Sequence, residues 1–262
     1  MKQSSIFEGN ELRLSPPNID GNIARCYFYG TGVNAEKYKI PLSEDLFSKH
    51  MLFVGGIGMG KTNGIFQVTS QLRGHMTQND VMLIFDTKGD FYNEFYQPGD
   101  IVISNDEKAT GPIGKDYWNI FREVDEGASA EEEIIEIARA LFYERSKQSN
   151  QPFFPNAARD IFTGLLLHFT RMNSNTTNAG LRTFLDLSPS SEIRNVLQAH
   201  DDLKAMVSYI SDDRSPQTQG VISELQQHLR EIFVGNFRKD GTLSIRKSIR
   251  NKGGRLIFIE YD

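Results

Sequence analysis

A glycine-rich loop followed by lysine and threonine is the segment of this sequence with the clearest chemical role. Residues 50–62 read HMLFVGGIGMGKT, and the pattern G-x-x-x-x-G-K-[ST] fits from Gly55 to Thr62. Glycines have no Cβ, so the backbone can bend tightly and turn successive N–H groups toward an anion. The pattern therefore predicts a loop that holds the phosphates of a nucleoside triphosphate.

Each part of this loop has an expected contact. We expect Lys61 to reach the β- and γ-phosphates and the Thr62 hydroxyl to hold Mg²⁺, which makes both candidate catalytic residues with ATP and Mg²⁺ as cofactors. The helix that follows adds its positive N-terminal end. The alternative is a glycine-rich turn with a solvated lysine. The predicted nucleotide-binding residues are Gly55, Gly56, Ile57, Gly58, Met59, Gly60, Lys61 and Thr62.

The segments around the loop predict an α/β fold. The apolar run at 51–55 indicates a strand, and Ile65, Val68 and Leu72 have the spacing of a helix over 60–73. Residues 81–86 (VMLIFD) indicate a strand covered on both faces, and 101–103 indicate a third strand. Strand, helix and strand in this order favour a parallel-rich central sheet of the doubly wound kind.

The remaining sequence indicates two changes of character. Residues 1–47 contain short apolar runs between turn signals and are expected to be β-rich, while 128–235 are mostly helical. Strand character returns only at 255–259. We therefore predict an inserted all-α domain, with segments 1–47 (β-rich), 48–125 (first part of the nucleotide-binding domain), 126–235 (all-α) and 236–262 (return to the nucleotide-binding domain, incomplete).

Several helices of this region have recognisable starts. Ser129-Ala-Glu-Glu132 has the form of a capping box and opens a helix through Tyr143. A helix near Pro155 repeats apolar residues at 158, 162, 165 and 169, and Ser215-Pro216 begins another helix that runs through Ile232. Shorter helical pieces are expected at 181–185, 192–199 and 203–210.

Asp86 is the third candidate catalytic residue. It ends the strand that follows the glycine-rich loop, in the sequence DTKGD, and so is expected at the crevice where open parallel sheets bind ligands. There it could hold Mg²⁺ through water or order the attacking water. The alternative is a residue that forms the turn before Gly89. The strings D-x-x-G and T-K-x-D also occur in GTPases, but here they overlap, so we treat that match as chance.

Composition excludes several classes of protein. The single cysteine, Cys26, allows no internal disulfide, and the five histidines have no metal-binding spacing. No apolar run approaches the roughly 18 residues of a membrane span. With a net charge of −5, any contact with a DNA backbone must come from a local basic patch. The candidate patch is the basic cluster of 238–255, and the alternative interpretation of this cluster is a solvated surface. The cluster consists of Arg238, Lys239, Arg246, Lys247, Arg250, Lys252 and Arg255.

Three segments together resemble a known family. HMLFVGGIGMGKT, MLIFDTKGDFY and QPFFPNAARDIFTGLLLHF are similar to the phosphate-binding loop, the second-strand motif and the helical-domain signature of TraG/TraD-like coupling proteins of type IV secretion and conjugation. These belong to the FtsK/HerA superfamily of DNA-pumping ATPases. The resemblance begins near Pro41 and covers the rest of the chain.

The resemblance implies a RecA-like P-loop domain with an inserted all-α domain that moves DNA or a relaxase–DNA complex. It also implies a homo-hexamer with DNA in its channel, relaxase and secretion-channel proteins as partners, and a cytoplasmic location, often at the inner membrane. The family's strand ending in Asp-Glu and its membrane helices are not found here, and the last strand ends in Glu260-Tyr-Asp262. We therefore expect a fragment of a longer protein, and leave open whether the chain itself hydrolyses ATP.

Two other functions fit the loop. A P-loop protein without the catalytic acid could bind ATP and act as a regulatory or scaffold module without turnover. A small-molecule kinase would need a lid with several arginines near the loop, and the sequence contains no convincing lid.

Overall fold

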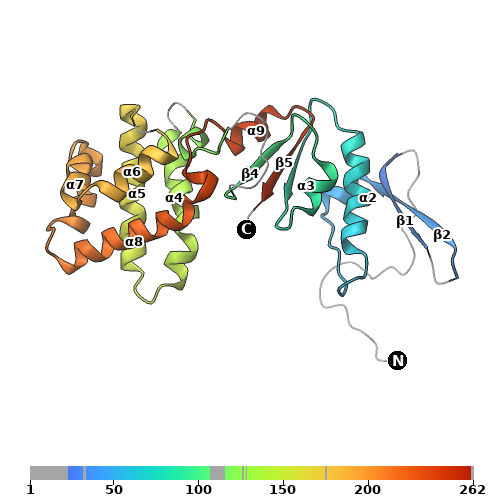
Figure 1. The fold of residues 1–262 in the computed structure, drawn as a ribbon, viewed down its shortest axis with the longest axis horizontal. Coiled ribbons are helices and arrows are strands. Elements are labelled where there is room, and N and C mark those ends of the chain that lie inside the picture. The colour runs from blue at the N-terminus through green and yellow to red at the C-terminus, as the bar shows by residue number, and fades with distance from the viewer. Residues whose placement is uncertain are drawn as a thin grey trace. The chain divides into compact units, whose positions relative to one another are not determined.

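The computed structural model describes residues 23–31, 34–106, 116–125, 127, 129–174 and 176–260. The chain divides into two compact units, residues 1–80 and 81–262, which are described separately below. Figure 1 labels the helices and strands of both units. The predicted strands and turns at 1–22 lie outside the described residues.

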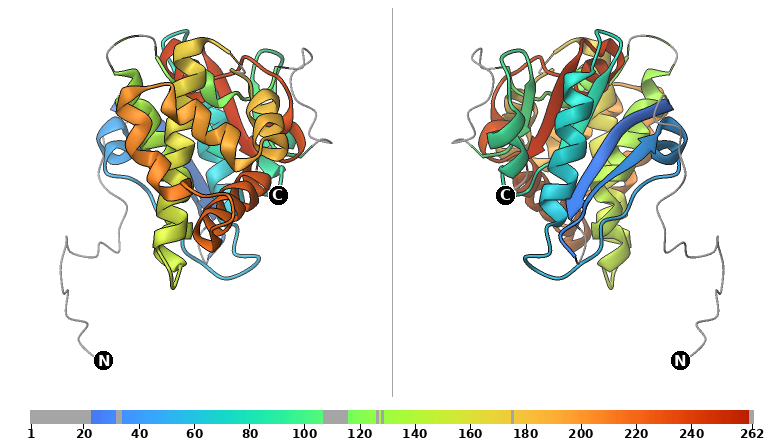
Figure 2. Two further views of the ribbon diagram at one scale, coloured as in Figure 1. Left: turned by 90° about the vertical axis from the view of Figure 1, so that its left-hand side faces the viewer. Right: turned by 90° about the vertical axis from the view of Figure 1, so that its right-hand side faces the viewer.

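The first unit is built from a β-hairpin and a long helix. Strands β1 (Ala24–Thr31) and β2 (Lys37–Ser43) pair antiparallel, followed by the short helix α1 (Glu44–Ser48) and by α2 (Lys61–Gly74). Figure 2 shows the hairpin, in blue, alongside α2, in cyan. A small core forms between them, because Cys26, Leu42 and Val68 are buried together.

Two glutamines of α2 close the outer edge of β1. The Gln67 side-chain amide accepts from the Tyr29 N–H at 2.9 Å and donates to the Tyr29 carbonyl at 3.2 Å. Gln71 repeats this with Tyr27, at 2.9 and 2.7 Å. Residues four apart lie on one face of a helix, and backbone groups of alternate residues point to one edge of a strand, so the two spacings match. The amides thus replace a neighbouring strand.

The strand predicted at 51–55 is not formed. Residues 51–56 have no regular secondary structure, and Leu52 and Val54 are 87% and 83% exposed. A strand needs a hydrogen-bonded neighbour. In the described part of this unit β2 pairs with β1 alone, and the edge of β1 is taken by α2. The predicted helix over 60–73 is confirmed as α2.

A parallel three-stranded sheet forms the first part of the second unit. Strands β3 (Val81–Phe85) and β4 (Ile101–Ser104) both pair with β5 (Arg255–Glu260), which lies between them. Helix α3 (Asp90–Phe95) connects β3 to β4. The strands predicted at 81–86, 101–103 and 255–259 are confirmed, and with them the α/β fold. The expected burial of β3 on both faces is wrong: this edge strand leaves Phe85 73% exposed.

Two buried asparagines join the segments that lead into and out of the helical region. Asn178 donates to the carbonyls of Trp118 and Phe237, at 2.8 and 2.9 Å, and accepts from the Ile120 N–H at 3.0 Å. Asn119 donates to the carbonyls of Thr176 and Gly241. The side-chain nitrogen and oxygen of both asparagines therefore have partners, as buried polar groups require. The 3-10 helices η2 (Ile120–Glu123) and η4 (Gly235–Arg238) lie in these segments.

Helices fill residues 130–232 around one apolar core. The core includes Phe142, Phe162, Leu185, Leu197 and Leu225, each at most 1% exposed. The core-facing residues at 158, 162, 165 and 169 are all buried, as their spacing predicts. The elements are α4 (Ala130–Gln148), α5 (Phe153–Met172), α6 (Asn178–Leu187), α7 (Ser190–Gln198), the 3-10 helix η3 (Asp201–Ile210) and α8 (Pro216–Ile232).

The two predicted helix starts have different outcomes. Ser215 caps α8, because its hydroxyl accepts from the Gln217 N–H, with Pro216 in the first turn. The capping box at Ser129 is wrong. Ser129 has helical backbone angles (φ −84°, ψ −9°) and makes no side-chain cap bond, since a cap requires an extended residue at that position. The carboxylate of Glu133 instead accepts from the Asp125 N–H at 2.7 Å.

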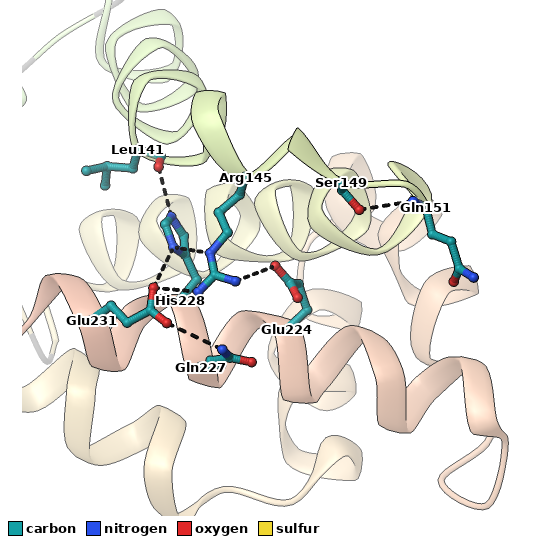
Figure 3. Close-up of polar contacts among 8 residues, drawn as sticks. All are labelled: Leu141, Arg145, Ser149, Gln151, Glu224, Gln227, His228 and Glu231. Carbon is teal, nitrogen blue, oxygen red and sulfur yellow. Dashed lines mark hydrogen bonds and ion pairs between the residues drawn. The ribbon is translucent and has the colours of Figure 1, made fainter. Parts of the chain in front are cut away.

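An arginine and a histidine connect α4 to α8 (Figure 3). Arg145 lies between Glu224 and Glu231 and donates from Nε to His228 Nδ1 at 3.3 Å. The other ring nitrogen of His228 lies 2.8 Å from the Leu141 carbonyl, which can only accept. His228 is therefore the neutral tautomer with its proton on Nε2. Burial lowers the pKa of His228, and Arg145 lowers it further.

Within the described ranges, no helix is both long enough and apolar enough to cross a bilayer. The helical character of 130–232, with β4 before it and β5 after it in the chain, fits an inserted helical domain. The four domain boundaries themselves remain a prediction.

Candidate functional site

The glycine-rich loop has the backbone form that its sequence requires. Gly58 and Gly60 have φ of 77° and 81°, in the left-handed region that residues with a Cβ seldom adopt. Helix α2 begins directly after Gly60, and the Gly64 N–H donates to the Gly60 carbonyl at 3.0 Å. The glycine-rich loop therefore leads directly into the N-terminus of α2.

Lys61 lies inside this loop. Its ammonium group donates to the carbonyls of Gly55 and Gly56, both at 2.7 Å. Hydrogen bonds to charged phosphate oxygens are stronger than those to neutral carbonyls, so the Lys61 side chain can exchange these two partners for phosphate. The loop thus brings the ammonium group and the glycine backbone to one place, as predicted.

The first turn of α2 brings no negative charge of its own to the N-terminus of the helix. No side chain caps it, and its first turn contains no acidic residue. The first N–H groups of a helix have no partner within the helix, and they carry its positive partial charge. Thr62 lies in this first turn and is exposed. The exposed side chains of Ile57 and Met59 leave their backbone groups as the parts of these residues that could contact an anion.

Asp86 lies at the carboxyl end of the parallel sheet. It directly follows β3, is 4% exposed, and its carboxylate accepts from the Tyr92 N–H at 2.8 Å. It lines a cavity of about 200 Å³ together with Ser104 and Glu260, which end β4 and β5. Gly89, with φ of 72°, makes the turn after Asp86. Asp86 therefore makes a contact at the turn before Gly89, as the alternative interpretation expects, and it also lines a cavity.

Glu260 is a site residue that the sequence analysis did not select. Burial raises the pKa of its carboxyl, and the negative charges of Asp86 and Asp106 raise it further. A carboxyl with a raised pKa can exchange protons near neutrality more readily than an ordinary glutamate. The only signal in the sequence was the acidic end of the last strand. Its neighbours come from β3 and from the residues after β4, far away along the chain.

The basic cluster of 238–255 is in part structural. Helix α9 (Ile245–Asn251) begins where Glu123 accepts from the N–H groups of Ile245 and Arg246. Arg246 pairs with Glu133 at 2.9 Å, and Arg250 pairs with Asp125. These contacts bind α9 to the start of the helical region. They favour a structural role for both arginines over DNA contact.

The described residues contain no group of three or more histidine, cysteine, aspartate or glutamate side chains suited to a metal.

The parallel sheet, its helices and the phosphate-binding loop define a P-loop α/β protein. The sequence matches the family described as type IV secretion-system coupling protein DNA-binding domain over residues 35–262, and the chain belongs to this family. The family resemblance drawn from the sequence is thus confirmed, and DNA is a partner of the family.

Two solved structures have a similar fold. One is a bacterial conjugative coupling protein, TrwB, in a trigonal form in complex with sulphate, with 18% identity and a TM-score of 0.64. The other is the plasmid coupling protein TrwB in complex with the non-hydrolysable ATP analogue ADPNP, with 19% identity and a TM-score of 0.64. Each match covers 84% of this chain and 49% of the other, so the chain spans about half of their length. Comparison with curated proteins gave no match.

Proposed function

We propose that this chain is the ATP-binding part of a conjugative coupling ATPase that transfers DNA, or a DNA–protein complex, through a type IV secretion system. The observation that carries the proposal is the position of Lys61 in the loop, at the uncapped start of α2. Family membership supports DNA as the cargo. The ATP analogue bound to the related TrwB supports ATP as the nucleotide.

The loop residues have separate parts in holding ATP. The backbone N–H groups of Gly58, Gly60 and the first turn of α2 face the phosphates, and Lys61 neutralises the β- and γ-phosphates. The Thr62 hydroxyl is a ligand of Mg²⁺, which would neutralise phosphate charge during transfer. The absence of acidic residues from the first turn of α2 supports this arrangement, because a carboxylate there would repel the phosphates.

The acidic cavity at the sheet is the second part of the proposal. The Asp86 carboxylate accepts a hydrogen bond from the Tyr92 N–H, which fixes its position. We assign Asp86 to ordering water near the metal. We also assign to the complete protein a homo-hexameric assembly, relaxase and secretion-channel partners, and a cytoplasmic position at the membrane. These assignments rest on the family.

Replacement of Lys61 tests the nucleotide site. Binding of fluorescent mant-ATP is measured with wild type, Lys61→Ala and Lys49→Ala. Lys49 is an exposed lysine of the same unit that pairs only with Asp45 in the described residues. Loss of a charged hydrogen-bonding group should weaken binding about ten- to hundredfold in Lys61→Ala and leave the control unchanged. Equal affinities for all three proteins would contradict the site.

A binding module without turnover is the alternative function. The acids that line the cavity at the sheet, Asp86 and Glu260, are not adjacent in sequence as an Asp-Glu pair would be, and this favours binding without hydrolysis. Phosphate release at saturating ATP separates the two functions. Binding without release favours the module, while release that requires Lys61 and Asp86 favours the motor.

A further inference from the structure

The outer face of the β1–β2 hairpin carries tyrosines and lysines together. Tyr27 pairs with Pro41 and Tyr29 with Lys39, so these residues share one face of the hairpin, and Lys37 lies opposite Thr31 on the same face. The two tyrosine rings lie 6.3 Å apart. The Lys39 ammonium lies 3.9 Å from the centre of the Tyr27 ring and 6.0 Å from that of Tyr29.

The outer face of the hairpin lies opposite the face that packs in the core of the first unit. Cys26, Leu42 and Phe28 belong to the opposite face and pack against α2. Gln67 and Gln71 occupy the outer edge of β1. Tyr29 is 52% exposed, although a tyrosine ring offers apolar area that is usually buried at least in part. Among the described residues, α2 therefore packs behind the hairpin and closes the edge of β1, and the exposed side chains of the outer face include Tyr29, Lys37 and Lys39.

The described charged side chains of this face are lysines. Lys37 and Lys39 are both exposed, and the acids that flank the two strands in sequence, Glu36 and Glu44, have partners of their own. Glu36 accepts from the Tyr38 hydroxyl at 3.0 Å, and Glu44 lies 3.7 Å from the Arg25 guanidinium. In a chain with a net charge of −5, two lysines beside two tyrosines form a local site for a polyanion.

We propose that the outer face of the hairpin binds single-stranded DNA, with Lys37 and Lys39 on backbone phosphates and one base stacked on Tyr29. Stacking on an exposed ring requires an unpaired base, so duplex DNA could use only the lysines. A protein partner would have to offer acidic and apolar groups together, whereas a nucleic-acid strand carries both phosphates and flat rings. The inference goes beyond the nucleotide site and shares with the proposed function only DNA as the partner.

Fluorescence anisotropy of a labelled oligo-dT of about 20 nucleotides, with the full chain at several salt concentrations, tests this proposal. Tyr29→Ala should weaken binding about tenfold, and Tyr29→Phe, which keeps the ring, should restore it. Lys37→Ala should reduce the slope of log affinity against log salt by about 0.7, the value for one phosphate contact on a single strand. A duplex of the same length should bind more weakly and respond less to Tyr29→Ala.

Two matched variants serve as controls. Tyr143 is 58% exposed on α4, with the Lys147 ammonium 5.6 Å from the centre of its ring, and Lys49 is an exposed lysine outside the hairpin. Tyr143→Ala and Lys49→Ala should bind the oligonucleotide as wild type does. Thermal melting of all variants checks that each is folded.

Three results would overturn the proposal. Affinities of Tyr29→Ala and Lys37→Ala equal to those of the controls would remove the hairpin from the DNA site. A lower molar mass of Tyr29→Ala in light scattering, with unchanged DNA affinity, would assign the face to contact between copies of the chain. No binding of wild type to any oligonucleotide would contradict DNA as cargo as well, while mant-ATP binding would still report on the nucleotide site.

Discussion

Asn178 offers a quantitative test of how the helical region is joined to the sheet. The residue is fully buried and makes three hydrogen bonds of 2.8 to 3.0 Å to Trp118, Phe237 and Ile120. Asn178→Ala leaves two carbonyls and one N–H without partners. At about 1 kcal/mol for each lost bond, and more if water cannot enter, the free energy of unfolding should fall by about 3–5 kcal/mol. That is a large part of the stability of an ordinary domain.

Urea unfolding followed by tryptophan fluorescence measures this change. Trp118 is the single tryptophan of the chain, and its indole stacks on Phe233 beside the junction, so its emission reports on this region. Asn195→Ala is the control, because Asn195 is exposed on α7 and should change stability by less than about 0.5 kcal/mol. A loss below about 1 kcal/mol in Asn178→Ala would show that the three bonds do not hold the junction together.

Two further predictions concern the loop and the helical core. Gly60→Ala adds a Cβ to a residue with φ of 81°, and no other atom lies within 4 Å of it, so the cost is backbone strain of about 1–2 kcal/mol. The affinity for mant-ATP should therefore fall roughly five- to thirtyfold. Gly74→Ala is the control: its Cβ meets open space and Gly74 has no positive φ, so this variant should bind mant-ATP as wild type does. The pKa of His228 is lower in the folded protein than in the unfolded chain. As the pH falls below about 6.5, the ordinary pKa of histidine, the unfolded chain therefore binds a proton before the folded protein does. Stability should therefore decline with falling pH in that range, by at most about 1.4 kcal/mol per pH unit, and His228→Gln should decline less steeply in urea titrations at pH 7 and 5.5; equal declines would contradict the neutral tautomer.

Elements with strong local signals were predictable. Helix α5 follows from apolar residues at 158, 162, 165 and 169, since that spacing makes one face that only a core can bury. The loop at 55–62 follows from its glycines, because two of them adopt a positive φ. The start of α8 follows from Ser215, because its hydroxyl accepts from the N–H of Gln217, only two residues further along the chain.

Features that depend on distant residues were not predictable. The capping box at Ser129 failed because the position adopts helical angles, and no local pattern reveals this. Gln67 and Gln71 look like an ordinary solvated helix face until β1 lies beside them. The raised pKa of Glu260 depends on its burial and on Asp86 and Asp106, which follow the other two strands of the sheet. The apolar run at 51–55 is visible in the sequence, but whether another strand lies beside it to form hydrogen bonds depends on the fold.

The position of β5 in the middle of the sheet determines when that sheet can form. In the described structure β3 and β4 pair with β5 and not with each other, and Val81 meets Arg255 only after the whole helical stretch has been made. On the ribosome, both strands must wait with unpaired edges while the helices, rich in local contacts, are free to fold first. Synthesis that stops before residue 255 would therefore release a chain with folded helices and two open strands, a species prone to aggregate.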